Sequence, residues 1–179
     1  MERLGSPHLG FRVVHVTGTK GKGAVCALVE AAMRRAGLSV GRYASPHLHR
    51  VNERISSNGI AVSDNDLAAA LRAAIDAYNS ARLDGTPAAD ATWFDMVTAA
   101  AFVSFKAAGV AWVVAEVWLG GRHDSTNVLN GEIAVVTNVE LEHTEVLGKT
   151  RAAIAYEKAG ILKPSAVLVT PLHRDDEVG

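Results

Sequence analysis

Residues 12–24 are RVVHVTGTKGKGA, and this stretch decides the fold. The β-branched run at 12–16 predicts a buried strand that ends at a turn beginning with Gly18. From Lys22 onward, apolar residues recur at helical spacing, and Gly37 is placed to end that helix. A strand, a glycine-rich turn and a helix in this order favour a phosphate-binding unit.

The turn at 18–24 has three glycines among its first six residues, so its backbone can bend tightly and present N–H groups. The following helix start adds partial positive charge, and Lys22 can reach the β- and γ-phosphates of a nucleotide. The spacing departs from the G-x-x-x-x-G-K-[ST] pattern, so a plain glycine-rich turn with an exposed lysine is the alternative. Ala24 stands where a hydroxyl residue would be expected near magnesium, so other groups must hold the metal or it is held more weakly.

Short apolar runs and helical patterns alternate along the rest of the chain. Further strands are predicted at 39–43, 110–117, 133–136 and 166–169, and further helices from Ser63, from Thr92 to Gly109 and at 150–160. Residues 45–58 lack periodicity and predict a long functional loop. The alternation predicts one α/β domain over 1–179, with a mostly parallel sheet, helices on both faces and a likeness to P-loop NTPases.

Composition narrows the function classes. Hydrophobic residues make up 49% and charged residues 21%, which excludes a disordered chain, and the net charge of −1 disfavours a nucleic-acid partner. Cys26 is the single cysteine, so an internal disulfide is excluded. No apolar run reaches the roughly 18 residues of a membrane span, and the N-terminus does not have the pattern of a signal peptide. We therefore expect a cytoplasmic protein without a membrane partner.

Further motifs follow the phosphate loop in order: SPHL at 45–48, ERI at 53–55, NG at 58–59, TWF at 92–94, LGGRHDSTN at 119–127, TN at 137–138, EH at 142–143, LG at 147–148 and EKAGI at 157–161. With TGTKGKG at 17–23, they resemble the folylpolyglutamate synthase and dihydrofolate synthase family of the Mur ligase superfamily. The resemblance covers residues 4–170 and corresponds in size to that family's ATPase domain. It implies that the family's N-terminal segment and its C-terminal glutamate-binding domain lie outside this chain.

The resemblance implies a role for each of several positions. It implies that the ATP phosphates contact Gly18, Thr19, Lys20, Gly21, Lys22, Gly23, Ala24 and Asn138. It implies a Mg²⁺ site at Ser45, Glu116 and His143, and these hydroxyl, carboxylate and imidazole groups suit a hard cation that keeps some waters. It also implies catalytic roles for Lys22, His143 and Lys158, the last being the lysine that is carbamylated in the family.

Each of these positions could instead have a purely structural role. Glu116 interrupts an apolar strand near the end where open sheets bind ligands, and burying it unpaired would be costly. Its alternative is an exposed carboxylate at the strand end. For His143 the alternative is a surface or capping residue, and for Lys158 it is a solvated lysine on a short helix.

Five positions match the substrate side of the family: Thr92, Phe94, His123, Asp124 and Ser125. Aromatic and polar side chains suit a flat heteroaromatic ring such as a pteridine, although Phe94 alone could be the first core residue of its helix. Arg50 and Arg54 would be available to carboxylates, or would serve solubility only. Trp118 and His123 stand where the family commonly has Gly and Leu.

The function implied by the resemblance is an ATP-dependent ligase. It would join L-glutamate to a folate or pteroate carboxylate through an acyl phosphate, release ADP and phosphate, and act as a monomer on small molecules. Two alternatives stay open: an inactive or truncated nucleotide-binding domain, which Ala24 favours, and a Mur-type ligase for peptidoglycan precursors. A bare P-loop switch or kinase would explain the loop but not the motifs that follow it.

Overall fold

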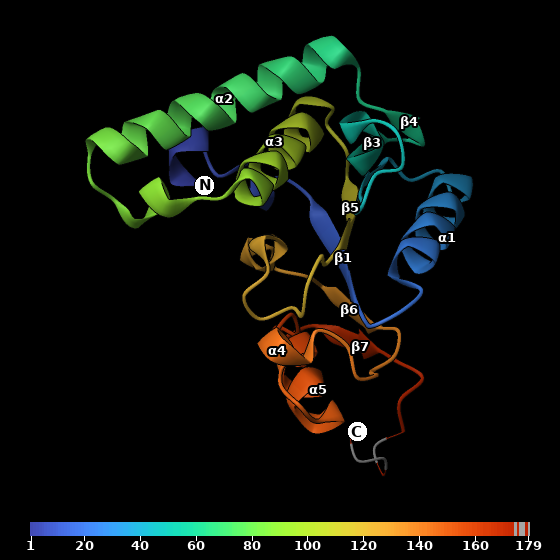
Figure 1. Ribbon diagram of the computed structural model, residues 1–179. Coiled ribbons are helices and arrows are strands. Elements are labelled where there is room, and N and C mark those ends of the chain that lie inside the picture. Colours follow the sequence, from blue (N-terminus) through green and yellow to red (C-terminus); the bar gives the residue numbers. More distant parts are fainter. Residues whose placement is uncertain (174, 176–177, 179) are drawn as a thin grey trace.

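A computed structural model describes residues 1–173, 175 and 178, and over these residues the chain forms a seven-stranded sheet. The strands follow the spatial order β4-β3-β2-β5-β1-β6-β7 (Figure 1). Their bounds are β1 (Arg12–Thr17), β2 (Val40–Tyr43), β3 (Ile55–Ser57), β4 (Ile60–Ala61), β5 (Trp112–Glu116), β6 (Ile133–Val136) and β7 (Val167–Val169). Strands β2, β5, β1, β6 and β7 are parallel, whereas β3 pairs antiparallel with both β2 and β4. The prediction of a mostly parallel α/β sheet is confirmed.

Helices cover both faces of this sheet. They are α1 (Lys22–Arg35), α2 (Asp64–Leu83), α3 (Trp93–Ala107), α4 (Thr144–Leu147) and α5 (Arg151–Ala159). Figure 1 shows α1 on one side of the sheet and α3 on the other, with α2 packed along α3. In the described part of the chain, no helix combines the length and the apolar character needed to cross a membrane.

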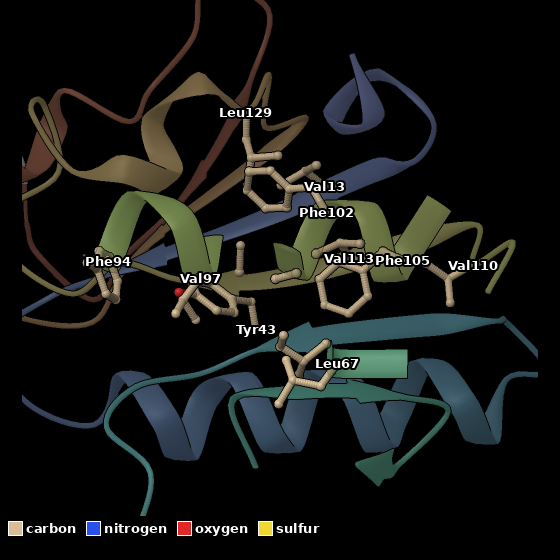
Figure 2. Packing of buried hydrophobic residues seen from close by; sticks show 13 residues of the cluster. Val13, Tyr43, Leu67, Phe94, Val97, Phe102, Phe105, Val110, Val113 and Leu129 are labelled. Carbon is tan, nitrogen blue, oxygen red and sulfur yellow. The ribbon is translucent and has the colours of Figure 1, made fainter. Parts of the chain in front are cut away.

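The main core lies between the sheet and α3. Phe102 and Phe105 of α3 are fully buried against Val13 and Val113 of the central strands (Figure 2). Because successive strand residues point to opposite faces, Val14 of β1 instead packs on the α1 side. Burying each large apolar side chain contributes about 2 kcal/mol to stability. The two clusters, one on the α3 side of the sheet and one on the α1 side, thereby fix the strands whose ends lie beside the phosphate loop.

The expected long loop at 45–58 is partly ordered into regular structure, which corrects the prediction. It contains a 3₁₀ turn at Val51–Arg54 and the strand β3, which joins β4 through Asn58 and Gly59. These two residues have φ values of 51° and 80°, the left-handed conformation that tight hairpins require. A three-residue strand is too short for alternation to be visible in the sequence. The helix α4 was not expected either, because its four residues are too few to show a helical period.

The strand β7 forms one edge of the sheet and pairs with β6. Val167, Leu168 and Val169 keep 62%, 47% and 51% of their surfaces exposed. The edge is therefore apolar over all three of its residues.

Candidate functional site

The phosphate loop adopts the bends that its glycines allow. Gly18 and Gly21 have φ values of 146° and 81°, and Gly21 caps the N-terminus of α1. A Cβ on Gly18 would lie 1.8 Å from the hydroxyl oxygen of Thr137, so no other residue fits there. The first N–H groups of α1 therefore open toward the loop, where an anion can accept from them.

The segment after β6 holds this loop in shape. The side-chain oxygen of Asn138 accepts the backbone N–H groups of Thr19 at 3.1 Å and of Lys20 at 2.9 Å. The Thr137 hydroxyl donates to the carbonyl of Lys20 at 2.7 Å. Asn138 thus acts on the loop backbone, and the direct nucleotide contact expected of it stays a prediction.

Lys22 folds over the loop from the first turn of α1. Its Nζ donates to the carbonyls of Gly18 at 3.0 Å and of Thr19 at 3.4 Å. Its charge acts both on Glu116 and on the Glu142–Lys158 pair. The Lys22 ammonium therefore influences two separate groups of ionisable side chains electrostatically.

Ser45 and Glu116 are brought together beside the phosphate loop. Glu116 ends β5 with 3% of its surface exposed, which rules out the alternative of an exposed carboxylate, and its Oε2 accepts the backbone N–H of Ser45 at 3.0 Å. A Cβ on Gly23 would lie 3.6 and 3.7 Å from the two carboxylate oxygens, so Glu116 faces the first turn of α1. Burial raises the pKa of Glu116, while the Ser45 N–H and the charge of Lys22 oppose that rise.

The Ser45 hydroxyl is positioned to act as a metal ligand. Its Oγ is buried and has no hydrogen-bond partner in the described part of the chain. Buried hydroxyls are normally paired, because an unpaired one costs about 1–3 kcal/mol. An unpaired oxygen next to a buried carboxylate fits a hard cation such as Mg²⁺.

His143 is not joined to this pair. It precedes α4 with a left-handed backbone, and its side chain is 56% exposed, with Nδ1 4.0 Å from Oε1 of Glu145. Among the described residues it makes no hydrogen bond or ion pair with Ser45 or Glu116, and no three His, Cys, Asp or Glu side chains gather closely enough to hold a metal. Its roles as metal ligand and catalytic residue stay predictions.

Lys158 is buried, which excludes the alternative of a solvated lysine. Only 1% of its side chain is exposed, and its Nζ lies 2.8 Å from Oε1 of Glu142. Burial lowers the pKa of Lys158, and the Glu142 carboxylate opposes that shift. Burial alone would raise the pKa of Glu142, but Lys158 and Thr19 together hold it below its ordinary value.

The five residues expected on the substrate side line one cavity of about 460 Å³. The remaining lining residues are Asp95, Trp118, Leu119, Gly120, Gly121, Val146, Leu147 and Glu157. The cavity adjoins the Lys158 helix, because the N–H of Arg122 donates to the carbonyl of Glu157 at 2.9 Å. The structure therefore gathers these five positions, while their contact with a substrate stays a prediction.

Asp124 uses its whole carboxylate to shape the cavity wall. Its Oδ2 accepts the N–H groups of Trp118 at 3.0 Å and Leu119 at 3.1 Å, and its Oδ1 accepts the N–H and the hydroxyl of Thr126. The Thr126 oxygen lies 2.8 Å from Nε2 of buried His15. Burial lowers the pKa of His15 to about 3, so His15 is neutral. Because the Thr126 hydroxyl donates its proton to Asp124, the Nε2 of His15 is the donor to Thr126.

Asp95 is a cavity residue that the sequence reasoning missed. It forms a capping box with Thr92, and its Oδ1 accepts the Ser125 hydroxyl at 2.6 Å. The spacing T-x-x-D at 92–95 was an available signal for such a box. Asp95 and Ser125 also border a second cavity, of about 570 Å³, between the N-terminal turn, α2 and α3.

Phe94 is both a core and a cavity residue, so its two interpretations are compatible. It is 8% exposed, and its ring centroid lies 5.0 Å from that of Trp118 and 6.1 Å from that of Tyr43. The guanidinium of Arg54 lies 6.0 Å from the Phe94 ring and is largely buried. Arg50 instead is exposed and paired with Asp64, as expected of a residue that serves solubility.

No family model matches the chain, but individual proteins do. It is 40% identical over 171 residues to dihydrofolate synthase/folylpolyglutamate synthase of Bacillus subtilis, covering 95% of this chain and 39% of that protein. A complex of FPGS with AMPPCP and folate superimposes with a TM-score of 0.89 at 38% identity, over 94% of this chain and 41% of the other. FolC of E. coli in complex with DHPP and ADP gives 0.82 at 34% identity, over 95% and 41%. The chain spans about two fifths of the length of these relatives, and over nearly its whole length it is similar to members of the folylpolyglutamate synthase/dihydrofolate synthase family.

Proposed function

We propose that this chain is the ATP-binding domain of a ligase that joins L-glutamate to the carboxylate of a folate or pteroate. The observation that carries the proposal is the unpaired Ser45 hydroxyl, which lies beside Glu116 and next to the phosphate loop. Solved structures of relatives with the same fold contain AMPPCP and folate in one case and DHPP and ADP in another. These structures support the proposal of a nucleotide and an acid substrate as ligands.

The proposed binding of the nucleotide phosphates depends on the loop and on Lys22. The N–H groups at the start of α1 bind phosphate oxygens, and Lys22 exchanges its two carbonyl partners for the β- and γ-phosphates. Mg²⁺ would be held by Ser45 and Glu116, with His143 as the third ligand that the family resemblance implies. When bound, the metal neutralises phosphate charge.

The reaction proposed for the whole enzyme has two steps. The substrate carboxylate attacks the γ-phosphorus in line, which forms an acyl phosphate and ADP, and the amine of glutamate then attacks the acyl carbon and displaces phosphate. The residues of this chain position the reactants and stabilise charge. We place the glutamate site outside residues 1–179, so these residues alone are not expected to complete ligation. The whole enzyme would act in the cytoplasm as a monomer.

Lys158 is proposed as a carbamate. Burial lowers its pKa and so enlarges the fraction of neutral amine, whose lone pair attacks the carbon of CO₂ with loss of one proton to solvent. The product is an anion, so Glu142 would have to give up its contact with Nζ. The carbamate would add negative charge beside the phosphate loop, where a second metal ion could be held.

The competing proposal is a nucleotide-binding domain without catalytic activity. The observation in its favour is Ala24, whose methyl group is exposed on the first turn of α1 and cannot ligate a metal.

Titration calorimetry with AMPPCP, with and without Mg²⁺, tests the phosphate site. We expect Mg²⁺-dependent binding that falls at least about tenfold in Lys22→Ala, because the charge facing the phosphates is lost. Lys149→Ala, which removes an exposed lysine outside the loop, is the matched control and should bind as the wild type does. A folded chain that binds no nucleotide contradicts the proposal, and binding without folate-dependent turnover by the full-length enzyme favours the inactive domain.

A further inference from the structure

A buried ion pair joins α1 to the sheet on the face opposite α3. Arg42 of β2 donates its Nε–H to Oε2 of Glu30 on α1 at 2.6 Å, and the Ser56 hydroxyl on β3 donates to Oε1 of the same carboxylate at 3.3 Å. Glu30 is 5% exposed, on a helix face that otherwise packs apolar residues such as Val29. Burying such a pair costs about as much free energy as its attraction returns, so stability alone does not account for it.

Arg42 is also a neighbour of Glu116 on the adjacent strand. In the parallel pairing of β2 with β5, Arg42 lies opposite Val114, and Glu116 is two residues further along on the same face. Strands about 4.8 Å apart with a rise of about 3.3 Å per residue place such neighbours about 8 Å apart, which an arginine side chain can span. Burial raises the pKa of Glu116, and the charge of Arg42 is among the influences that oppose that rise.

The pairing with Glu30 directs the guanidinium of Arg42 away from Glu116. Among the described residues, Arg42 makes no hydrogen bond or ion pair with Glu116. The Glu116 carboxylate instead accepts the backbone N–H of Ser45 at 3.0 Å and faces Gly23 at the start of α1. A guanidinium that turned to Glu116 would form a charge-assisted hydrogen bond with its oxygens and compete with a metal ion for them.

We propose that Glu30 is a positioning residue, which holds Arg42 away from Glu116 and so keeps that carboxylate free for Mg²⁺. The inference rests on the proposed function, because Mg²⁺ is the cation that Ser45 and Glu116 are proposed to hold. Glu30 acts through Arg42 and contacts no ligand itself. The Ser56 hydroxyl fixes the second oxygen of Glu30, so the carboxylate is held from two neighbouring strands.

The Mg²⁺ concentration that gives half-maximal binding of AMPPCP measures how free Glu116 is. In Glu30→Ala, Arg42 loses its partner and turns to Glu116, so we expect this concentration to rise roughly fivefold or more. Adding Arg42→Leu removes the competing guanidinium, so the double variant should return to within about twofold of the wild type. AMPPCP affinity at saturating Mg²⁺ should stay near that of the wild type in both variants.

Two further variants serve as a second test and a control. Glu30→Gln keeps the shape of the side chain but loses its charge, so it should raise the half-maximal Mg²⁺ concentration by at least about twofold even if Glu30→Ala does not fold. Glu132→Ala releases a guanidinium at the opposite end of the sheet, where Arg12 donates to both Glu132 oxygens at 2.7 and 2.6 Å. That control should leave the Mg²⁺ dependence unchanged.

Thermal unfolding without nucleotide shows whether each variant is folded, and a merely structural role of Glu30 would lower stability without changing the Mg²⁺ dependence. If the wild type binds AMPPCP equally well with and without Mg²⁺, the proposed metal site fails and this inference with it. If the wild type depends on Mg²⁺ and the folded Glu30 variants share its half-maximal concentration, only the role of Glu30 is overturned. A double variant as impaired as Glu30→Ala overturns the part assigned to Arg42.

Discussion

The ammonium of Lys158 lies 2.8 Å from the carboxylate of Glu142, and 1% of the Lys158 side chain is exposed against 22% for Glu142. The pair joins α5 to the segment that follows β6. The same segment holds the phosphate loop through Asn138. The ion pair therefore links the helix bearing Lys158 to the loop that carries Lys22.

Glu142→Leu should destabilise the fold by about 3 kcal/mol, because it leaves a buried ammonium without its partner. Urea unfolding measures the loss. Glu145→Gln, a change on a side chain that is 74% exposed, should stay within about 0.5 kcal/mol of the wild type. Adding Lys158→Met to Glu142→Leu should restore most of the stability, and an equal loss in the double variant would contradict the argument.

His15 should make stability depend on pH. Its folded pKa is about 3, against 6.5 for a free histidine, so below pH 6.5 the unfolded chain takes up a proton that the folded chain does not. Stability is thus fully present above pH 6.5 and falls with acidification, by about 2 kcal/mol between pH 7 and pH 5 from this residue alone. Unfolding of His15→Gln, which keeps an N–H donor for Thr126 but does not titrate, should show a correspondingly shallower pH dependence.

Ser45→Ala should separate stability from metal binding. The Ser45 Oγ is buried without a partner, so its removal should leave the free energy of unfolding unchanged or raise it by up to about 1 kcal/mol. The backbone N–H that bonds to Glu116 remains. Mg²⁺-dependent binding of AMPPCP should nevertheless weaken. Thermal unfolding without nucleotide and calorimetry with it check the two halves, and a stability loss with intact Mg²⁺ dependence would refute the assignment.

Asp124→Ala should lower stability by about 2–3 kcal/mol, because it leaves the buried N–H and hydroxyl of Thr126 without their acceptor, together with the partly buried N–H groups of Trp118 and Leu119. Pteroate binding should weaken as well, since the cavity wall loses its support. His123→Ala alters the adjacent exposed side chain on the same wall and should change stability by less than about 0.5 kcal/mol. Similar losses in both variants would show that Asp124 has no special structural role.

Local sequence patterns were sufficient to predict those elements whose conformation depends only on nearby residues. The β-branched run before Gly18 and the helical spacing after Lys22 predict β1, the phosphate loop and α1, because each depends on neighbours within a few residues. The strand β3 escaped prediction although Asn58 and Gly59 are a known hairpin signal, since three residues show no period.

The site itself depends on contacts that no local pattern contains. Ser45 and Glu116 are 71 residues apart, and Lys158 reaches Glu142 across 16 residues. Family resemblance pointed to Glu116 and Lys158, but burial and pairing of these side chains follow only from the packed sheet.

The strand β7 has a consequence for the handling of this chain. An apolar strand whose outer edge pairs with no other strand of the described residues is a template for a strand from another molecule. Purified domain should therefore self-associate as its concentration rises, and binding isotherms recorded at several protein concentrations will differ unless the oligomer is accounted for. Light scattering across a dilution series belongs beside every titration.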